Sequence, residues 1–325
     1  MSETPPPIRW GILGTGGIAA TFTEDLLRMP DQVVAAVGSR APASAAAFAE
    51  RYAIPAAYGS YAELAADPSL DVIYVATPHS GHHAAALLCL RAGRAVLCEK
   101  SFTVTAAEAE ELVAAAGIAN RFLMEAMWTR FNPAVVRLRE LVAEGVIGEV
   151  RSVTADFSFS FPYDPAHRLF DPGLGGGAVL DLGVYPVSFA WMLLGEPATV
   201  HAVAGLAPNG VDANTGILLG YRNGAVALLH CSLEAEGPVA ATVLGTKGRI
   251  EVHAPFFRPT ALTVHPAGAE RWTYSVELDG HGYTYQAAEV ASRLRAGELE
   301  SPVMSLAETV GIMRTLDTIR AQVAR

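Results

Sequence analysis

Lys100 and two later residues, Asp181 and Tyr185, are the side chains of this sequence best suited to acid–base chemistry. Lys100 closes an apolar run that begins at Ala95, so we expect its amine at the end of a buried strand rather than on a solvated helix face. Asp181 and Tyr185 are four residues apart, and this spacing places both side chains on one face of a helix. These three residues are the candidate catalytic set.

Hydride transfer to or from an alcohol carbon needs a group that removes or returns the hydroxyl proton. A tyrosine can do so only if its pKa falls from about 10 toward neutrality, a change of about 4 kcal/mol. A cation about 4 Å away supplies roughly this energy at an effective dielectric constant of about 20. We therefore expect Lys100 to assist Tyr185. By itself, a tyrosine among apolar residues is more typical of an ordinary core helix.

A glycine-rich string follows the first apolar run. It fits the pattern Gly-x-Gly-x-x-Ala, whose glycines allow a tight turn and the close approach of a pyrophosphate. The string alone is weak, because a chain with 30 glycines can contain it by chance, but its place between a strand and a helix predicts a dinucleotide site. The alternative is a plain strand-to-helix turn. The residues concerned are Gly14, Thr15, Gly16, Gly17, Ile18 and Ala19.

The end of the second strand indicates the type of cofactor. An NAD(H)-selecting enzyme is expected to carry Asp or Glu there, whereas Ser39 and Arg40 offer a hydroxyl and a guanidinium to a 2′-phosphate. NADP(H) is therefore favoured; NAD(H) stays open, because the alternative is that Arg40 is solvated or stacks on adenine. His82 also suits a helix cap or the surface. The other expected cofactor contacts are Thr77, Pro78, His79, His82, Glu99 and Lys100.

Aromatic side chains predict the substrate pocket. Phe157, Phe159 and Phe161 alternate along one predicted strand, so their rings share a face that suits a sugar ring or a cyclic diol. The alternative is that these rings bury the sheet against helices. The residues predicted to contact substrate are Trp128, Arg130, Phe159 and Arg168. The alternative for Arg168 is a contact with a partner subunit.

The elements that would position these residues fall into two groups. Apolar runs at 8–13, 33–37, 72–76 and 95–98 alternate with helical patterns at about 18–27, 43–52, 81–92 and 105–116, which is typical of a doubly wound parallel sheet. Longer, alternating strands follow at 153–161, 198–204, 213–221, 225–233 and 239–246, which predicts a large, mostly antiparallel sheet open on one face.

We therefore expect an α/β architecture. A Rossmann domain would cover residues 1–126, and an α+β substrate domain with the antiparallel sheet would cover residues 127–325. The final amphipathic helix, 306–323, would pack back on the first domain or on the sheet.

Composition restricts the partners. The formal net charge of −10 and the scattered Lys and Arg residues argue against a nucleic-acid partner. The chain shows no secretory signal and no apolar stretch of membrane-spanning length, so we expect a cytoplasmic protein without a membrane partner. Cys89, Cys98 and Cys231 suit reduced, buried thiols better than disulfides or a zinc site, and we expect no metal.

Several motifs resemble those of a known family. The glycine string, Thr77-Pro78, Glu99-Lys100 and the segments 127–131 and 175–186 are similar to motifs of the glucose-fructose oxidoreductase, inositol dehydrogenase and rhizopine catabolism (Gfo/Idh/MocA) family. Within it, segments 168–172 and 181–186 resemble the branch of dimeric dihydrodiol dehydrogenase and NADP-dependent D-xylose dehydrogenase.

The resemblance implies roles for individual residues. Lys100 would be the lysine of a Glu-Lys-Pro motif, whose proline is Ser101 in this chain, Tyr185 would be the acid–base group, and Asp181 would orient the substrate. The implied reaction is NADP(H)-dependent hydride transfer at a sugar, polyol or cyclic trans-diol. The resemblance also implies a homodimer formed through the open face of the second sheet.

Two alternatives stay open. One is a reductase of ketosugars in secondary metabolism, which would use the same catalytic residues with a different pocket. The other is a non-catalytic NADP(H) sensor, which would not need Lys100, Asp181 and Tyr185 together.

Overall fold

The computed structural model describes residues 6–323 and divides into two compact units. The first unit comprises the chain up to Trp128 together with Asp279–Thr309, and the second comprises Thr129–Leu278 together with the residues from Val310 onward. The segment that contains α8 (Thr284–Ala296) therefore returns to the first unit after the chain has built the second sheet.

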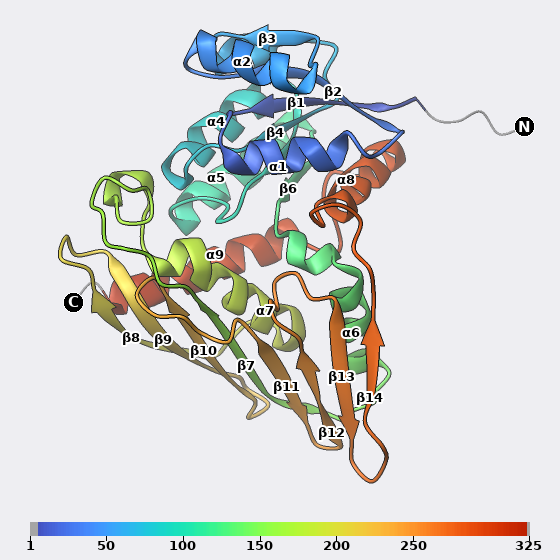
Figure 1. The fold of residues 1–325 in the computed structure, drawn as a ribbon, viewed down its shortest axis with the longest axis vertical. Coiled ribbons are helices and arrows are strands. Elements are labelled where there is room, and N and C mark those ends of the chain that lie inside the picture. Colours follow the sequence, from blue (N-terminus) through green and yellow to red (C-terminus); the bar gives the residue numbers. More distant parts are fainter. Residues whose placement is uncertain (1–5, 324–325) are drawn as a thin grey trace, which may run out of the picture. The chain divides into compact units, whose positions relative to one another are not determined.

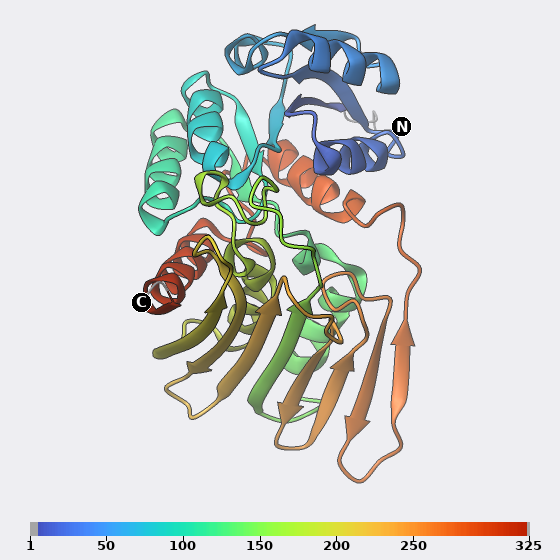
Figure 2. The ribbon, with the colours of Figure 1, turned by 60° about the vertical axis from the view of Figure 1, so that its left-hand side comes forward.

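The first unit contains a six-stranded sheet in the order β3-β2-β1-β4-β5-β6, and all neighbouring strands are parallel. The predicted doubly wound sheet is confirmed, and Figure 2 shows α4 and α5 on one face of it and α1 and α8 on the other. Its strands are β1 (Ile8–Leu13), β2 (Gln32–Gly38), β3 (Ala56–Tyr58), β4 (Val72–Val75), β5 (Ala95–Cys98) and β6 (Leu123–Glu125). Its helices, besides α8, are α1 (Gly17–Leu26), α2 (Pro42–Tyr52), α3 (Tyr61–Ala66), α4 (His79–Arg91) and α5 (Ala106–Ala119).

Burial explains why β4 and β5 are uninterrupted apolar runs. Every residue of β4 and β5 is buried, as expected for central strands covered by helices on both faces. α5 begins at Ala106, directly after its N-cap Thr105, because Thr105 and Glu108 form a reciprocal capping box at its first turn. The loops after β1, β2, β4 and β5 leave the same carboxyl edge of the sheet, where ligands bind in this class of fold.

The second unit contains an eight-stranded sheet in the order β14-β13-β12-β11-β7-β10-β9-β8. Its pairs are antiparallel except for β7 and β10, which run parallel, so the predicted mostly antiparallel sheet is confirmed. Its strands are β7 (Val150–Ser158), β8 (Thr199–Leu206), β9 (Asp212–Gly220), β10 (Val226–Ser232), β11 (Ala241–Gly245), β12 (Gly248–Val252), β13 (Ala261–Pro266) and β14 (Trp272–Ser275).

Helices cover one face of this sheet, as Figure 1 shows for α7 and α9. The buried indole of Trp191 on α7 donates a hydrogen bond to Thr315 on α9 at 3.1 Å, which joins these two helices. The opposite face is exposed, and residues alternate between the two faces along β9 and β10. Besides α8, the helical elements from Trp128 onward are η1 (Trp128–Phe131), α6 (Pro133–Ala143), η2 (Pro172–Leu174), the π-helical turn η3 (Val179–Gly183), α7 (Val184–Leu194) and α9 (Leu306–Val323).

Candidate active site

The glycine string forms the turn between β1 and α1. Gly14 has a φ of +109°, and a Cβ there would lie 2.7 Å from the carbonyl oxygen of Ala76, so this position requires glycine. At Gly16 and Gly17 an added Cβ would meet no atom of the described residues within 4 Å. The turn is therefore tight on one side and open to close approach on the other.

The first turn of α1 has the properties of an anion site. No side chain caps it, and it contains no acidic residue. Its backbone N–H groups are available to a ligand, and the helix dipole favours negative charge at this end. A dinucleotide pyrophosphate fits this arrangement, with Gly16, Gly17 and the first amides of α1 as the groups that would hold it.

The residues after β2 lie at the same edge of the sheet. Ser39 is buried, and its hydroxyl oxygen accepts a hydrogen bond from the backbone N–H of Ala41 at 3.3 Å. Arg40 is exposed, just before α2 begins at Pro42. A role for Ser39 and Arg40 at a 2′-phosphate stays a prediction.

His82 joins two loops of the first unit. It is 1% exposed, so the alternative of a surface histidine is wrong. Its Nδ1 lies 2.8 Å from the carbonyl oxygen of Ser101, and its Nε2 lies 2.8 Å from that of Thr77. Burial, with help from neighbouring His79, lowers the pKa of His82 to about 4. The neutral ring has a single N–H, so it donates to one of these carbonyls at a time.

Lys100 follows β5 and is partly buried. Its backbone N–H donates to the carboxylate of Glu99 at 3.2 Å, and the same carboxylate contacts the buried hydroxyl of Tyr74. The Tyr74 ring stacks on Phe22 with 4.0 Å between centroids. The peptide bond from Lys100 to Ser101 is cis. Glu99 and Tyr74 thus support the backbone that presents Lys100. A contact between Glu99 and the cofactor stays a prediction.

Asp181 and Tyr185 lie on one continuous helical segment of the second unit. The segment is not a regular α-helix, because Val179–Gly183 forms a π-helical turn that leads directly into α7. Such turns are frequent at functional sites. Asp181 and Tyr185 are each only 7% exposed.

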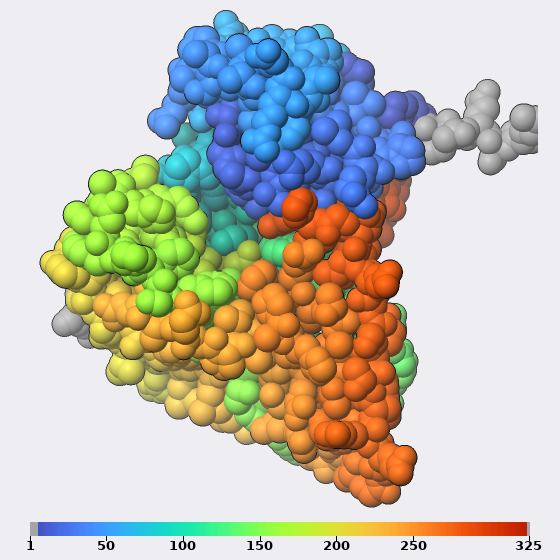
Figure 3. Space-filling model, in the orientation of Figure 1, coloured from blue at the N-terminus to red at the C-terminus, as the bar shows by residue number. Residues whose placement is uncertain are grey.

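Arg168 holds the Asp181 carboxylate. Its Nη1 lies 2.7 Å from Oδ1, and its Nη2 lies 3.5 Å from Oδ2. The arginine side chain is 53% exposed and the aspartate side chain only 10%. Arg168 belongs to the exposed segment 160–168, part of the rounded lime projection of the second unit in Figure 3.

Aromatic rings flank Tyr185. Phe157 stacks on Phe257 with 4.5 Å between centroids and an interplanar angle of 8°, and the Phe157 and Tyr185 centroids are 5.0 Å apart. β7 ends at Ser158, so the prediction that Phe159 and Phe161 continue the strand is wrong. Phe159 still packs edge to face against Phe157, with 5.4 Å between the ring centroids. Phe257 was missed, because it lies in a loop with no periodic pattern.

Trp128 and Arg130 lie on the short helix η1. In the first unit, the Trp128 ring stacks on Tyr283 with 4.3 Å between centroids. In the second unit, Arg130 is 3% exposed, and its guanidinium donates to the hydroxyl of Ser188 at 3.1 Å and to its carbonyl oxygen at 2.9 Å. These bonds anchor Arg130 to α7. Its contact with substrate stays a prediction.

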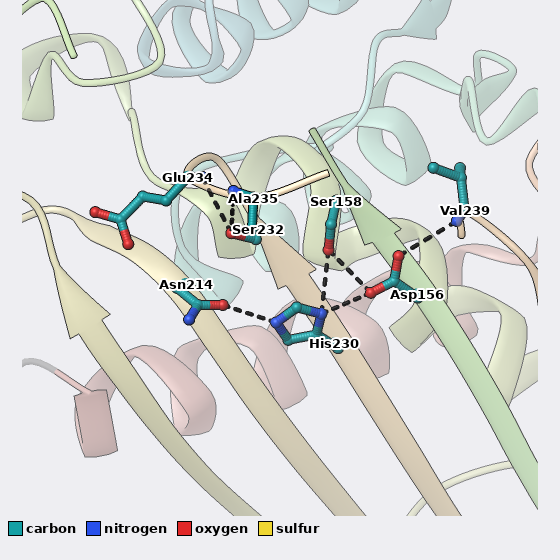
Figure 4. A network of polar contacts seen from close by, with 8 residues as sticks. All are labelled: Asp156, Ser158, Asn214, His230, Ser232, Glu234, Ala235 and Val239. Atoms are coloured by element: carbon teal, nitrogen blue, oxygen red, sulfur yellow. Dashed lines mark hydrogen bonds and ion pairs between the residues drawn. The ribbon is translucent and has the colours of Figure 1, made fainter. Parts of the chain in front are cut away.

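A separate polar cluster lies on the open face of the second sheet (Figure 4). The His230 ring contacts Asp156 through Nδ1 at 2.6 Å and Asn214 through Nε2 at 2.7 Å. The hydroxyl of Ser158 lies 3.1 Å from the same Nδ1. A serine nucleophile needs the carboxylate on the opposite ring nitrogen, so this cluster is not a hydrolytic triad.

Comparison with known proteins identifies the family. Residues 8–127 match the oxidoreductase family with an NAD-binding Rossmann fold, and residues 135–251 match the GFO/IDH/MocA C-terminal domain. The chain belongs to the Gfo/Idh/MocA family. The resemblance noted from the sequence motifs is thereby confirmed.

Individual relatives of this Gfo/Idh/MocA protein align over nearly its full length. The D-xylose 1-dehydrogenase (NADP(+)) of Hypocrea jecorina is 38% identical over 97% of this chain and 92% of its own. The trans-1,2-dihydrobenzene-1,2-diol dehydrogenase of Mus musculus is 41% identical over 96% of each chain. A 3-ketoreductase from Actinomadura kijaniata, solved with NADP and TDP-benzene, has a TM-score of 0.86, 27% identity and 98% coverage of both chains.

This member of the Gfo/Idh/MocA family is therefore an NAD(P)-dependent dehydrogenase that acts on CH–OH groups. Among residues 6–323, one helical stretch, Pro172–Leu194, is long and apolar enough to cross a membrane, and it is mostly buried as a core segment of the second unit.

Proposed function

We propose that the protein transfers a hydride between NADP(H) and a hydroxyl-bearing carbon of a sugar, polyol or cyclic trans-diol. The observation that carries this proposal is the setting of Tyr185. Its phenol lies beside the stacked rings of Phe157 and Phe257, and Asp181 precedes it on the same helical segment. A proton-transferring hydroxyl next to an apolar aromatic surface suits an alicyclic or sugar ring that carries a reacting hydroxyl.

When bound, the nicotinamide supplies or accepts the hydride. Tyr185 removes or returns the hydroxyl proton, Lys100 stabilises the phenolate that forms, and Asp181 orients a neighbouring hydroxyl of the substrate. Arg168 fixes the two oxygens of Asp181 so that they present a defined acceptor. Phe159 would extend the aromatic surface beside Tyr185, and a contact between Trp128 and substrate stays a prediction.

The choice of NADP(H) over NAD(H) rests on Ser39 and Arg40. The exposed Arg40 follows β2, which lies next to β1, and a ribose 2′-phosphate is expected there. Positions 39 and 40 carry no acidic residue that would repel this phosphate. Thr77, Pro78 and His79 would contact the remainder of the cofactor from the loop after β4 and the first residue of α4. We propose a cytoplasmic location.

A second copy of the chain is the proposed partner on the open face of the second sheet. Leu218 and Leu228 are paired directly across β9 and β10, and they are 44% and 51% exposed. With Val203, which is 77% exposed, they border a hollow of about 560 Å³ that also includes His201 and His230. An apolar sheet face of this kind suits a twofold interface in which the same surface is used twice.

The function is tested with a substrate panel. NADP+ and NAD+ would each be combined with D-xylose, other aldoses, inositols and trans-dihydrodiols, and NADPH would be combined with nucleotide-linked ketosugars. We expect NADP+ reduction with an aldose or a dihydrodiol. Turnover confined to nucleotide-linked ketosugars would favour the reductase alternative, in line with the similarity to a 3-ketoreductase. NADPH binding without turnover of any of these compounds would contradict the proposal.

A further inference from the structure

We propose that Asp212 is a positioning residue for the reaction: its carboxylate, supplied by strand β9, caps the helical segment that carries Asp181 and Tyr185 and sets the alignment of both side chains. This inference rests on the proposed function for the roles of Asp181 and Tyr185. Asp212 itself lies 27 residues beyond Tyr185 in the sequence, at the first position of its strand.

The first observation is a direct hydrogen bond. The backbone N–H of Val179, the first residue of the π-helical turn, donates to Oδ2 of Asp212 at 2.6 Å. The segment has no side-chain cap of its own, because its N-cap is Ala178. Unpaired N–H groups at a helix start are satisfied best by an acceptor with negative charge. Asp212 provides this acceptor from a different element.

The second observation explains the glycines that precede the segment. Gly177 has a φ of +116°, and an added Cβ would lie 2.2 Å from Oδ1 of Asp212. At Gly176 a Cβ would lie 2.8 to 2.9 Å from the carbonyl oxygens of Arg168, Leu169 and Asp171. Only glycine therefore fits at positions 176 and 177, where the backbone runs between the Arg168 loop and the Asp212 carboxylate. The same backbone carries Arg168, which pairs with Asp181.

The third observation is the environment of the carboxylate. Burial raises the pKa of Asp212 to about 6, although the Val179 N–H and the guanidinium of Arg320 on α9 act against this shift. From β10, the buried thiol of Cys231 also faces Asp212, which helps to raise the pKa of that thiol. A buried group that changes charge near pH 6 and bonds the helix start would couple the alignment of Asp181 and Tyr185 to pH.

Asp212→Asn is the informative variant, because it keeps the shape and an acceptor oxygen but removes the charge. Asp212→Ala removes the cap altogether. Asp171→Asn is the matched control, since Asp171 caps the short helix η2 in the same region through a 2.8 Å bond from the N–H of Gly173. Each variant would be assayed for kcat, KM and NADP+ affinity between pH 5 and 9 with the best substrate of the panel. Hydrogen exchange of residues 178–194 would be followed in parallel.

We expect kcat at pH 7.5 to fall on the order of tenfold in Asp212→Asn and further in Asp212→Ala, with NADP+ affinity unchanged. In the wild type, protonation of Asp212 should contribute to the fall in kcat at acidic pH. This contribution should be absent in Asp212→Asn. Exchange would increase in residues 178–194 and not in the control. Wild-type kcat, pH profile and exchange in Asp212→Asn would overturn the inference, even if Asp212→Ala failed to fold. If exchange is faster in Asp212→Asn but the wild type is inactive on every substrate, the capping role of Asp212 would stand and the proposed function would be rejected.

Discussion

The guanidinium of Arg168 lies 2.7 Å from Oδ1 of Asp181, although the arginine side chain is half exposed and the aspartate is nearly buried. The exposed partner thus holds the buried one in place. This ion pair adds little to stability, because the exposed guanidinium is screened by water, but it fixes the direction of both carboxylate oxygens.

Replacing Arg168 with lysine should therefore affect catalysis more than folding. A lysine keeps the charge but loses the two-pronged geometry, so we expect kcat/KM to fall about tenfold and the free energy of unfolding to change by less than about 1 kcal/mol. Steady-state kinetics and chemical denaturation measure the two quantities. An unchanged kcat/KM would show that Arg168 does not orient Asp181 for the reaction.

Cofactor choice is predicted to depend on Arg40. Removing its guanidinium in Arg40→Ala should lower kcat/KM for NADP+ by about tenfold or more, corresponding to loss of a charge-assisted contact of roughly 1.5 to 3 kcal/mol, and should leave the value for NAD+ nearly unchanged. Arg222→Ala, at an exposed turn of the second unit, is the control. Equal losses with both cofactors would argue that Arg40 stacks on adenine rather than binding the 2′-phosphate.

His82 predicts how stability depends on pH. Its pKa of about 4 in the folded protein lies below the ordinary value of 6.5, so the unfolded chain takes up a proton first as pH falls. The stability associated with the neutral ring is present above about pH 6.5 and is lost progressively toward pH 4, by up to about 3 kcal/mol. His82→Gln should be less stable at pH 7.5 but should lack this component of the pH dependence. Denaturation curves at pH 7.5, 6.5, 5.5 and 4.5 test it. Parallel curves for the two proteins would refute the account of His82.

The open sheet face is predicted to hold the dimer together. Leu228→Lys places a charge beside the exposed side chain of Leu218 and should convert a dimer to a monomer in sedimentation equilibrium. Ile118→Lys, at a residue of α5 that is 89% exposed, should leave the assembly intact. A wild-type protein that sediments as a monomer, or a Leu228→Lys variant that remains dimeric, would exclude this surface as the interface.

Buried strands were the part of the fold that the sequence determined best. β5 begins and ends where its apolar run does, because a strand covered on both faces consists of apolar residues. β1 also spans its predicted range, although it contains the partly buried Arg9. β14 was missed because it is only four residues long and largely exposed. The return of α8 to the first unit was also not foreseen, since it depends on contacts between segments that are far apart in the sequence.

In the candidate site, too, some features could be predicted from the sequence and others could not. The positions of the glycine turn, of Lys100 after a buried strand and of Asp181 and Tyr185 on one helical segment could be predicted from residue types and spacing; their catalytic and binding roles stay predictions. The ring of Phe257 and the cap from Asp212 could not, because each acts through contacts with residues far away in the sequence. The π-helical turn also escaped prediction, since its apolar residues fit an α-helix equally well.

The most direct test of the central claim compares Lys100→Ala with Lys247→Ala. Lys247 is the other lysine of the chain and lies in the turn between β11 and β12. With the preferred substrate, Lys100→Ala should reduce kcat by about 100-fold or more and change the dissociation constant of NADPH by less than about threefold, because the amine acts far more on the transferring proton than on cofactor binding. Lys247→Ala should match the wild type. A Lys100→Ala variant that retains near-normal kcat would contradict the account.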